Sequence, residues 1–231
     1  MLNPKKILEF YDKYFKALVL LTGMIFLLAI FFVLQAPDDY QQGAYSKIMY
    51  VHVPAAWLSL GIYSIMGICS FIYLVWQIPL SDLIAKSAAT TGTLFAAITL
   101  VTGSLWGKPI WGSWWVWDAR LTSMLILFFF YVSYLVLASI TKSIPNNKAC
   151  AALAVLGCIN IPIVKFSVNI WNSLHQPASI LKLSGPAIHS SMLIPLLLMF
   201  LLYSMFFALN LLLSCKYRIF SAKIKRHIFL K

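Results

Sequence analysis

Long apolar runs separated by short polar connections dominate the pattern of this chain. Six runs stand out, at 17–36, 51–76, 83–105, 120–141, 149–168 and 191–215. Each has about 20 residues or more, the length at which an α-helix crosses a hydrocarbon core about 30 Å thick. Backbone groups in lipid must pair internally, and the period-2 alternation of an outer-membrane barrel is absent. The pattern therefore predicts six transmembrane helices.

Composition narrows the class of protein in the same direction. The 231 residues are 61% hydrophobic and 10% charged, with a mean hydropathy of +0.86. A soluble domain would carry about 25% charged residues, so a water-facing globule is excluded. We expect an all-α polytopic integral membrane protein that forms a single membrane domain over 1–231. Its predicted parts are a basic segment 1–16, a bundle 17–215 and a basic tail 216–231.

The basic residues predict the orientation of these spans. The net charge is +12, which alone could indicate a nucleic-acid partner. Lys and Arg gather instead at the ends of apolar runs rather than on one soluble face, which argues against nucleic acid. With a cytoplasmic amino terminus, five of the 18 lie outside: Lys47, Lys108, Arg120, Lys165 and Lys182. The other 13 lie inside, as the positive-inside rule requires. Both termini are then cytoplasmic, and the first span is a retained helix rather than a signal peptide.

The predicted outer loops are longer and less ordinary than the inner ones. They span 37–50, 106–119 and 169–190, against inner connections at 77–82 and 142–148. Function tends to lie in such loops, so the outer face is the predicted working face. The third span is rich in Ala, Thr and Gly, which predicts a central position in the bundle. Pro162 should kink the fifth span.

Three of the four histidines fall on the predicted outer side. His52 lies at the mouth of the second span, just before Pro54, and His175 lies in the last outer loop, one helical turn after Trp171. His189 lies near the start of the sixth span. Taken alone, each is also compatible with an interfacial residue at a helix boundary. His227, in the basic tail, is interpreted as a solvated residue. The four cysteines are scattered and form no CxxC pair, so metal–thiolate chemistry is not indicated.

The stretch 107–122, GKPIWGSWWVWDARLT, holds half of the chain's eight tryptophans. Trp111, Trp114, Trp115 and Trp117 lie within seven positions, followed by Asp118 and Arg120. Aromatic belts at membrane interfaces are the ordinary explanation for such residues, but a belt spreads over several helices. Four indoles in one place form a broad apolar slab that suits a planar conjugated ligand.

Imidazoles and indoles on one side of one membrane point together to haem. Histidine is a common axial ligand of haem iron, and apolar surroundings tune the iron. The haem propionates need cations, for which the outer residues Arg120, Lys108 and Lys182 are candidates. We expect Asp118 to orient Arg120 or an indole N–H rather than to act as an acid.

The same residues resemble a known family. GKPIWGSWWVWDARLT is similar to the tryptophan-rich "WWD" signature of the haem-handling proteins of cytochrome c maturation, and most similar to the CcmC family of haem exporter components. The resemblance extends to IMYVHVPAAW around His52, to NSLHQPAS around His175, and to GPAI followed by SML and PLLLM. It covers nearly the whole chain from about residue 45 to 205, and the signature is long and specific.

The resemblance implies specific roles for residues of this chain. Histidines in the first and third outer loops of the family supply the two axial ligands of haem b in transit, and they correspond to His52 and His175. The tryptophan-rich loop, 106–120, carries haem and meets the periplasmic haem chaperone CcmE. It corresponds to Trp111, Gly112, Trp114, Trp115, Trp117, Asp118, Arg120, Leu121 and Thr122.

The implied function is the presentation of haem at the periplasmic face for the biogenesis of c-type cytochromes. The implied partners are haem, CcmE, the ABC transporter pair CcmA and CcmB, the small single-span protein CcmD and membrane lipid. The implied location is the bacterial inner membrane, with the mitochondrial inner membrane as the alternative. No nucleophile or general-base pair is evident, and Gly103–Lys108 does not complete a phosphate-binding loop. We therefore expect a transfer component without its own ATPase rather than an enzyme.

Two other functions fit parts of the pattern. A quinone-linked b-type cytochrome would use the same ligands, but electron transfer across a membrane usually needs haem ligands at both depths, and the inner halves of the predicted spans lack histidine. An ion-coupled transporter carries ionisable residues near the midplane. Here all six acidic residues lie at the ends of spans or in loops: Glu9, Asp12, Asp38, Asp39, Asp82 and Asp118.

Overall fold

The computed structural model describes residues 3–141, 148–171, 173–175, 180, 185 and 187–229, with side chains up to residue 223. These residues form an all-helical structure. In chain order the helices are α1 (Pro4–Gln35), the 3-10 helix η1 (Ala44–Ile48), α2 (Met49–Trp76), α3 (Pro79–Trp111), α4 (Ala119–Ile140), α5 (Ala149–Gly157), α6 (Asn160–Ile170) and α7 (Ser190–Phe229).

Six helical segments are long and apolar enough to cross a membrane, which confirms the predicted number of spans. The predicted fifth span corresponds to α5 and α6 together. Several helices run beyond their apolar cores. α1 takes in the basic amino-terminal segment because Asn3 caps the amide of Lys5 and Pro4 occupies the first turn. α7 likewise continues through the basic tail to Phe229.

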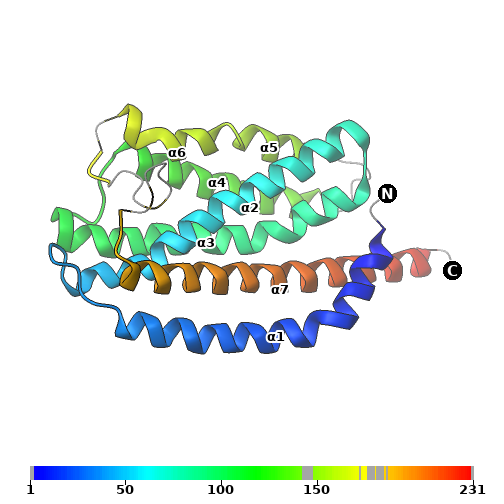
Figure 1. The fold of residues 1–231 in the computed structure, drawn as a ribbon. Coiled ribbons are helices and arrows are strands. Elements are labelled where there is room, and N and C mark those ends of the chain that lie inside the picture. The colour runs from blue at the N-terminus through cyan, green and yellow to red at the C-terminus, as the bar shows by residue number, and fades with distance from the viewer. Residues whose placement is uncertain are drawn as a thin grey trace.

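The helices lie side by side along one axis, with both chain ends at the same end of the bundle (Figure 1). α2 and α3 form the centre, and α2 packs against α3, α5 and α7. α1 lies at one edge and packs mainly on α7, so that Ala29 is its only buried residue in the described structure. The pair α5–α6 lies at the opposite edge (Figure 1).

The central position predicted for the third span is confirmed, and its small residues explain it. α3 packs against α2, α4 and α7. Its buried positions are mostly Ala, Ser, Thr and Gly, which let neighbouring helices approach closely. Among the glycines of α3, Gly92 has the least room for a side chain, because a Cβ there would lie 2.3 Å from the ring of Tyr131 on α4. Tyr131 is fully buried, and its hydroxyl donates a 2.7 Å hydrogen bond to the carbonyl of Ser59 on α2.

The interruption predicted at Pro162 is present, but it lies one turn upstream of the proline. α5 ends at Gly157 and α6 begins at Asn160. Proline has no N–H and its ring clashes with the carbonyl four residues before it, which here belongs to Cys158. That carbonyl instead accepts a hydrogen bond from Ile161 N at 3.1 Å.

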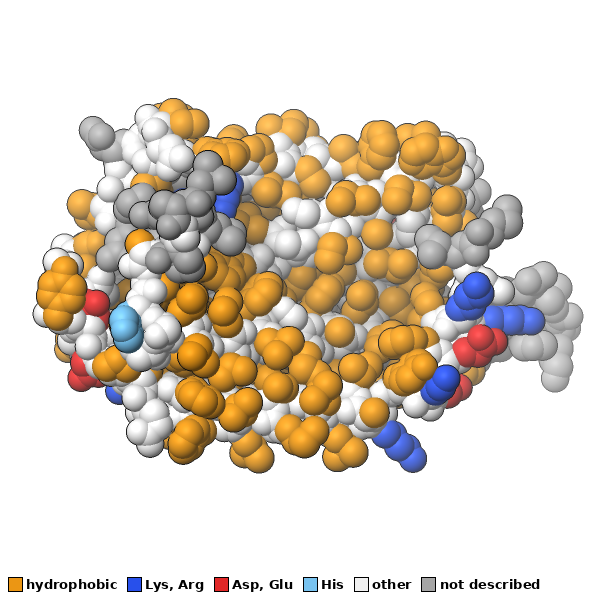
Figure 2. All heavy atoms as spheres, in the orientation of Figure 1, with side chains coloured by type: hydrophobic (Ala, Val, Ile, Leu, Met, Phe, Trp, Pro, Cys, Tyr) orange, Lys and Arg blue, Asp and Glu red, His pale blue; other side chains and the backbone are white. Residues whose placement is uncertain are grey.

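The surface has the distribution of apolar and charged side chains that is expected of a membrane protein. Hydrophobic side chains cover the middle of the visible face, while blue and red charged side chains lie towards its two ends (Figure 2). Exposed residues such as Leu20, Leu27 and Leu34 repeat along α1. Lipid tails rather than water are the natural surroundings of this belt.

Gly92→Ala tests the close contact between α3 and α4. The added methyl group must displace the buried Tyr131 ring, so we expect a loss of about 1–3 kcal/mol of stability. Thermal unfolding of the purified protein in detergent measures this loss. Gly23→Ala in α1 is the matched control, since no atom lies within 4 Å of its added Cβ. That substitution should leave stability unchanged or raise it by up to about 1 kcal/mol. Equal melting temperatures for both variants would contradict the packing.

Candidate functional site

A cavity of about 440 Å³ opens at the end of the bundle away from the chain termini, called the cavity end below. Its volume lies within the range of about 300–1,000 Å³ that is usual for small-molecule sites. Side chains of α2, α3, α4, α6 and α7 line it, together with Trp115, His175 and Ile180 from the connections. The structure thus brings both histidines predicted as ligands into one cavity.

His52 is fixed at the first turn of α2 by close contact with α3. Its side chain is buried, with 7% of its surface exposed. Nδ1 lies 3.1 Å from Thr102 Oγ1, and that hydroxyl donates its own proton to the carbonyl of Ile98 at 2.6 Å. Oγ1 is therefore the acceptor and Nδ1–H the donor, which leaves the Nε2 lone pair free to bind a metal. Gly103 makes room for the ring, since a Cβ there would lie 3.0 Å from His52 Cε1.

His175 approaches the same cavity from the connection that follows α6. Its ring lies 6.3 Å from the His52 ring between centroids, with 29° between the planes. Trp111, at the end of α3, contacts it edge to face at 5.8 Å. The backbone amide of His175 donates a 3.0 Å hydrogen bond to Ser173 Oγ.

Asp118 positions this connection, a role that was not predicted. Its charge acts on Arg120, the expected partner, but its hydrogen bonds go elsewhere. One oxygen caps α4 by accepting the amide of Leu121 at 2.7 Å, and the other accepts a short hydrogen bond from the Ser173 hydroxyl. A carboxylate is a preferred acceptor at a helix amino terminus because the amides there have no partner in the helix. Asp118 therefore ties the tryptophan-rich stretch to the segment that carries His175.

The four clustered tryptophans divide into two pairs. Trp111 and Trp115 line the cavity, whereas Trp114 and Trp117 do not and are 54% and 76% exposed. α3 runs on to Trp111 and ends at Gly112, whose φ of 75° is readily adopted only by glycine. Trp111 therefore belongs to a helix. The other three indoles follow in a short connection, in which Trp115 lines the cavity and Trp114 and Trp117 do not.

The cationic residues near the cavity also differ from the expected set. Arg120 lines it, as predicted, and donates a 3.3 Å hydrogen bond from Nη2 to the carbonyl of Lys165. Lys165, on α6, lines it as well. Lys108 does not: its ammonium donates to the carbonyl of Gly112 at 3.1 Å and lies over the Trp114 ring. Lys182 falls outside the described residues.

The arrangement suits a metal that brings its own equatorial ligands. Two imidazoles that bind one metal from opposite sides hold their nitrogens about 4 Å apart, since each metal–nitrogen bond is about 2 Å. Each nitrogen lies closer to the metal than its ring centroid does, so centroids 6.3 Å apart suit such a pair. Within the described residues, no group of three His, Cys, Asp or Glu side chains could hold a metal ion. The remaining ligands would have to come with the metal, as in a metalloporphyrin.

Comparison with known proteins identifies the family of this chain. The model of the heme exporter protein C (CcmC) family matches residues 1–229. The chain belongs to the CcmC family. Together with its six apolar helices, this membership makes it a multi-pass inner-membrane protein.

Several CcmC relatives are similar over most of their length. The heme exporter protein C of Bradyrhizobium diazoefficiens is 45% identical over 206 residues, which cover 89% of this chain and 78% of the relative. A ccmC-like mitochondrial protein of cytochrome c biosynthesis from Marchantia polymorpha is 51% identical over 82% of this chain and 78% of its own length. The heme exporter protein C of Haemophilus influenzae is 48% identical over 80% and 74%.

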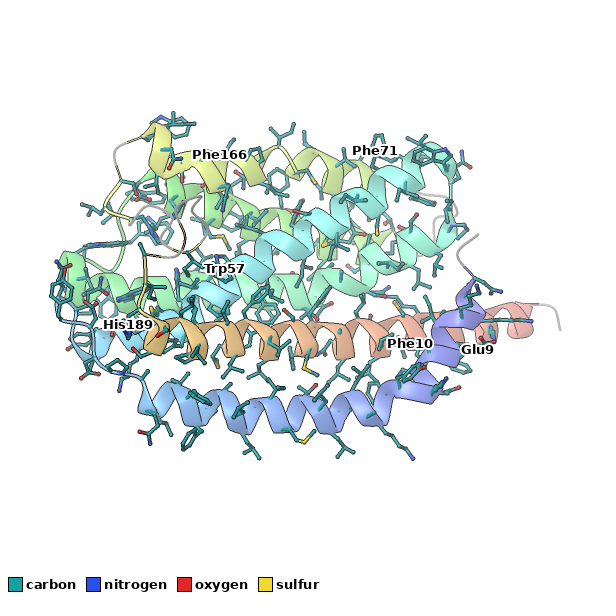
Figure 3. The ribbon with its side chains drawn as sticks, in the orientation of Figure 1. Glu9, Phe10, Trp57, Phe71, Phe166 and His189 are labelled. Carbon is teal, nitrogen blue, oxygen red and sulfur yellow. The ribbon has the colours of Figure 1, made fainter. Side chains whose placement is uncertain are left out.

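Two further tryptophans line the cavity of this CcmC chain and were not predicted. Trp106 contacts the His52 ring edge to face at 5.8 Å and donates from Nε1 to Gln42 at 3.0 Å. Trp57, on α2, lies inside the bundle and contacts Phe200 of α7 (Figure 3). The spacing of residues on α2 could have identified Trp57. His52, Ala56 and Leu60 recur every four residues and share the face that lines the cavity, and Trp57 lies beside them.

The other two histidines do not line the cavity. His189 is exposed at the cavity end, before α7 begins, and its Nδ1 lies 2.9 Å from Ser191 Oγ (Figure 3). This position agrees with the interpretation of His189 as a boundary residue. The side chain of His227 falls outside the described residues.

Asp118→Ala should release the segment that carries His175. We expect a loss of about 1 kcal/mol from the missing cap and faster amide hydrogen exchange at residues 173–175. Ser173→Ala should raise the exchange equally while sparing the cap. Asp39→Ala is the control, because Asp39 accepts the amides of Gln41 and Gln42 in another loop. Unchanged exchange at 173–175 in Asp118→Ala would contradict the positioning role.

Proposed function

We propose that this protein holds haem b in transit between His52 and His175 at the periplasmic face of the inner membrane and delivers it to the haem chaperone CcmE for the biogenesis of c-type cytochromes. Membership of the heme exporter protein C family supports the coarser part of this proposal, a role in haem handling and cytochrome c maturation within the Ccm system. Haem is then the cargo of the site rather than a resident cofactor.

One observation carries the proposal: the two imidazole rings lie 6.3 Å apart in a cavity with indole walls. His52 comes from a rigid helix and His175 from a connection of the chain. The lone pair of His52 Nε2 is free because Thr102 accepts Nδ1–H. An acceptor of this kind orients the ring and raises the basicity of the metal-binding nitrogen.

The two tryptophan pairs support two successive contacts. Trp111 and Trp115 lie where a porphyrin ring between the histidines would need apolar faces. Trp114 and Trp117 are exposed at the same end of the molecule. Exposed tryptophans of this kind are frequent anchors at protein interfaces. We assign the inner pair to haem and the outer pair to the chaperone.

The proposed orientation follows from the distribution of charge. The helix ends that bear the termini carry most of the Lys and Arg residues, which supports a cytoplasmic location for them by the positive-inside rule. The cavity end then faces the periplasm. The chain would contribute by holding haem and chaperone in the geometry of transfer, an effect of proximity. CcmA and CcmB would supply ATP hydrolysis, with CcmD as a small accessory protein.

Replacing either axial histidine tests the haem site. The purified parent should show the spectrum of a low-spin haem b, because two imidazoles bind the iron. His52→Ala and His175→Ala should each abolish or change that spectrum. His189→Ala is the matched control, since His189 is exposed and lies outside the cavity, and it should keep the parental spectrum. If both ligand variants kept that spectrum as well, the ligand assignment would be wrong.

Separating the tryptophan pairs tests delivery. Trp114→Ala combined with Trp117→Ala should keep the haem spectrum and lose haem transfer to the soluble domain of CcmE. Trp111→Ala combined with Trp115→Ala should weaken haem binding itself. A pull-down with the chaperone domain, with and without haem, measures the first effect and a haem titration the second. Trp76→Ala, exposed at the opposite end, should change neither. Intact transfer by the outer pair's variant would limit those indoles to anchoring in the membrane.

A further inference from the structure

The charged side chains that line the cavity are all potential cations. Besides the two histidines they are Arg120 on α4 and Lys165 on α6, and no Asp or Glu is among the described lining residues. The nearest carboxylate along the chain, Asp118, attracts Arg120 electrostatically, but its oxygens accept their hydrogen bonds from the amide of Leu121 and the hydroxyl of Ser173. The lining of the cavity therefore carries more positive than negative charge.

Two hydrogen-bond donors at the cavity wall have no partner among the described residues. They are Arg120 Nε and Trp115 Nε1, and both atoms are buried. An unpaired buried N–H costs about 1–3 kcal/mol, and more when the group is charged. Most buried polar atoms in native proteins are paired. These two donors indicate that an acceptor from outside the chain completes the site.

Lys165 is a second cation in the lining of the cavity, on α6. Its side chain is exposed, and its backbone carbonyl accepts the hydrogen bond from Arg120 Nη2, so the two residues lie next to each other. The ion pairs of the described chain lie elsewhere, at Lys47–Asp38, Lys86–Asp82 and Lys216–Asp12. An anionic group in the cavity would therefore meet two cations that form no ion pair within the described chain.

We propose that Trp115, Arg120 and Lys165 form a carboxylate-binding subsite at the α4–α6 side of the cavity, which orients haem by its propionate groups. This inference rests on the proposed function and adds Lys165, which was not among the expected propionate ligands. The guanidinium can bind one carboxylate through two parallel N–H donors, and the ammonium can bind as a point charge. The indole N–H supplies a neutral donor.

The opposite side of the cavity explains why the subsite would fix one orientation. Trp57, Ile188 and Leu196 line that side from α2 and from α7 and its approach, and they offer no charge. A porphyrin has one edge with two carboxylates and an apolar edge opposite. The cationic side accepts the first and the apolar side the second, so the reversed orientation would bury carboxylates without partners.

The test compares haem with haem dimethyl ester, in which both carboxylates are neutral. Purified full-length protein is titrated with each ligand in detergent, and the dissociation constant is read from the absorption spectrum. Lys165→Met should weaken haem binding by about tenfold or more, the usual effect of losing a hydrogen bond to a charged group. The same substitution should leave binding of the dimethyl ester unchanged. Lys165→Arg should retain most of the affinity for haem.

Lys47→Met is the matched control, since it removes one positive charge at the cavity end from a residue outside the cavity. It should bind both ligands like the parent. If Lys165→Met does not fold, Trp115→Phe removes the N–H donor while keeping an aromatic ring, and it should likewise reduce the preference for haem over the ester. Equal weakening of both ligands, or no weakening, would overturn the subsite while leaving the axial ligands intact. A parent that binds neither ligand would instead overturn the proposed function itself.

Discussion

The close contact between α2 and α3 is the constraint on which the site depends. It places His52 against Gly103 and aligns its Nδ1 with Thr102, so the ring is held in one orientation and presents one nitrogen to the cavity. Small residues along α3 make this approach possible. An imidazole on a freely moving loop would lose rotational freedom on binding a metal, whereas here folding has already fixed it.

The second imidazole, that of His175, is positioned by hydrogen bonds of its connection rather than by a helix. His175 lies in a connection, and the carboxylate of Asp118 fixes that connection through Ser173. Because Asp118 also begins α4, the segment of His175 and the tryptophan-rich stretch share one anchor point. Any shift of the start of α4 would therefore move Trp115, Arg120 and His175 together. Asp118 of the tryptophan-rich signature therefore connects two segments that are far apart in sequence.

Hydropathy predicted the number of spans and the all-helical class, because lipid permits few alternatives for an apolar chain. The small residues of the third span predicted its central position. The sequence also identified His52, His175, Trp111, Trp115 and Arg120 as candidates, and the structure brings them to one cavity. Trp57, Trp106 and the role of Lys165 were missed. Their contribution depends on which face of a helix meets the cavity, and a run that is apolar all round does not reveal that face. The predicted slab of four indoles is divided between the cavity and the surface. α3 ends at Gly112, so three of the four lie in an irregular connection whose side-chain directions no helical or strand period predicts.

The length of α7 has a consequence for the end that bears the termini. A helix of 40 residues is about 60 Å long, roughly twice the hydrocarbon thickness. α7 must therefore project well past the acyl chains. In this extended part of α7, the Lys216 side chain contacts α1. Its ammonium pairs with Asp12 and lies 3.7 Å from the Tyr11 ring centroid. The first helix, which packs mainly on α7, is therefore joined to the extended part of that helix by charge as well as by apolar contact.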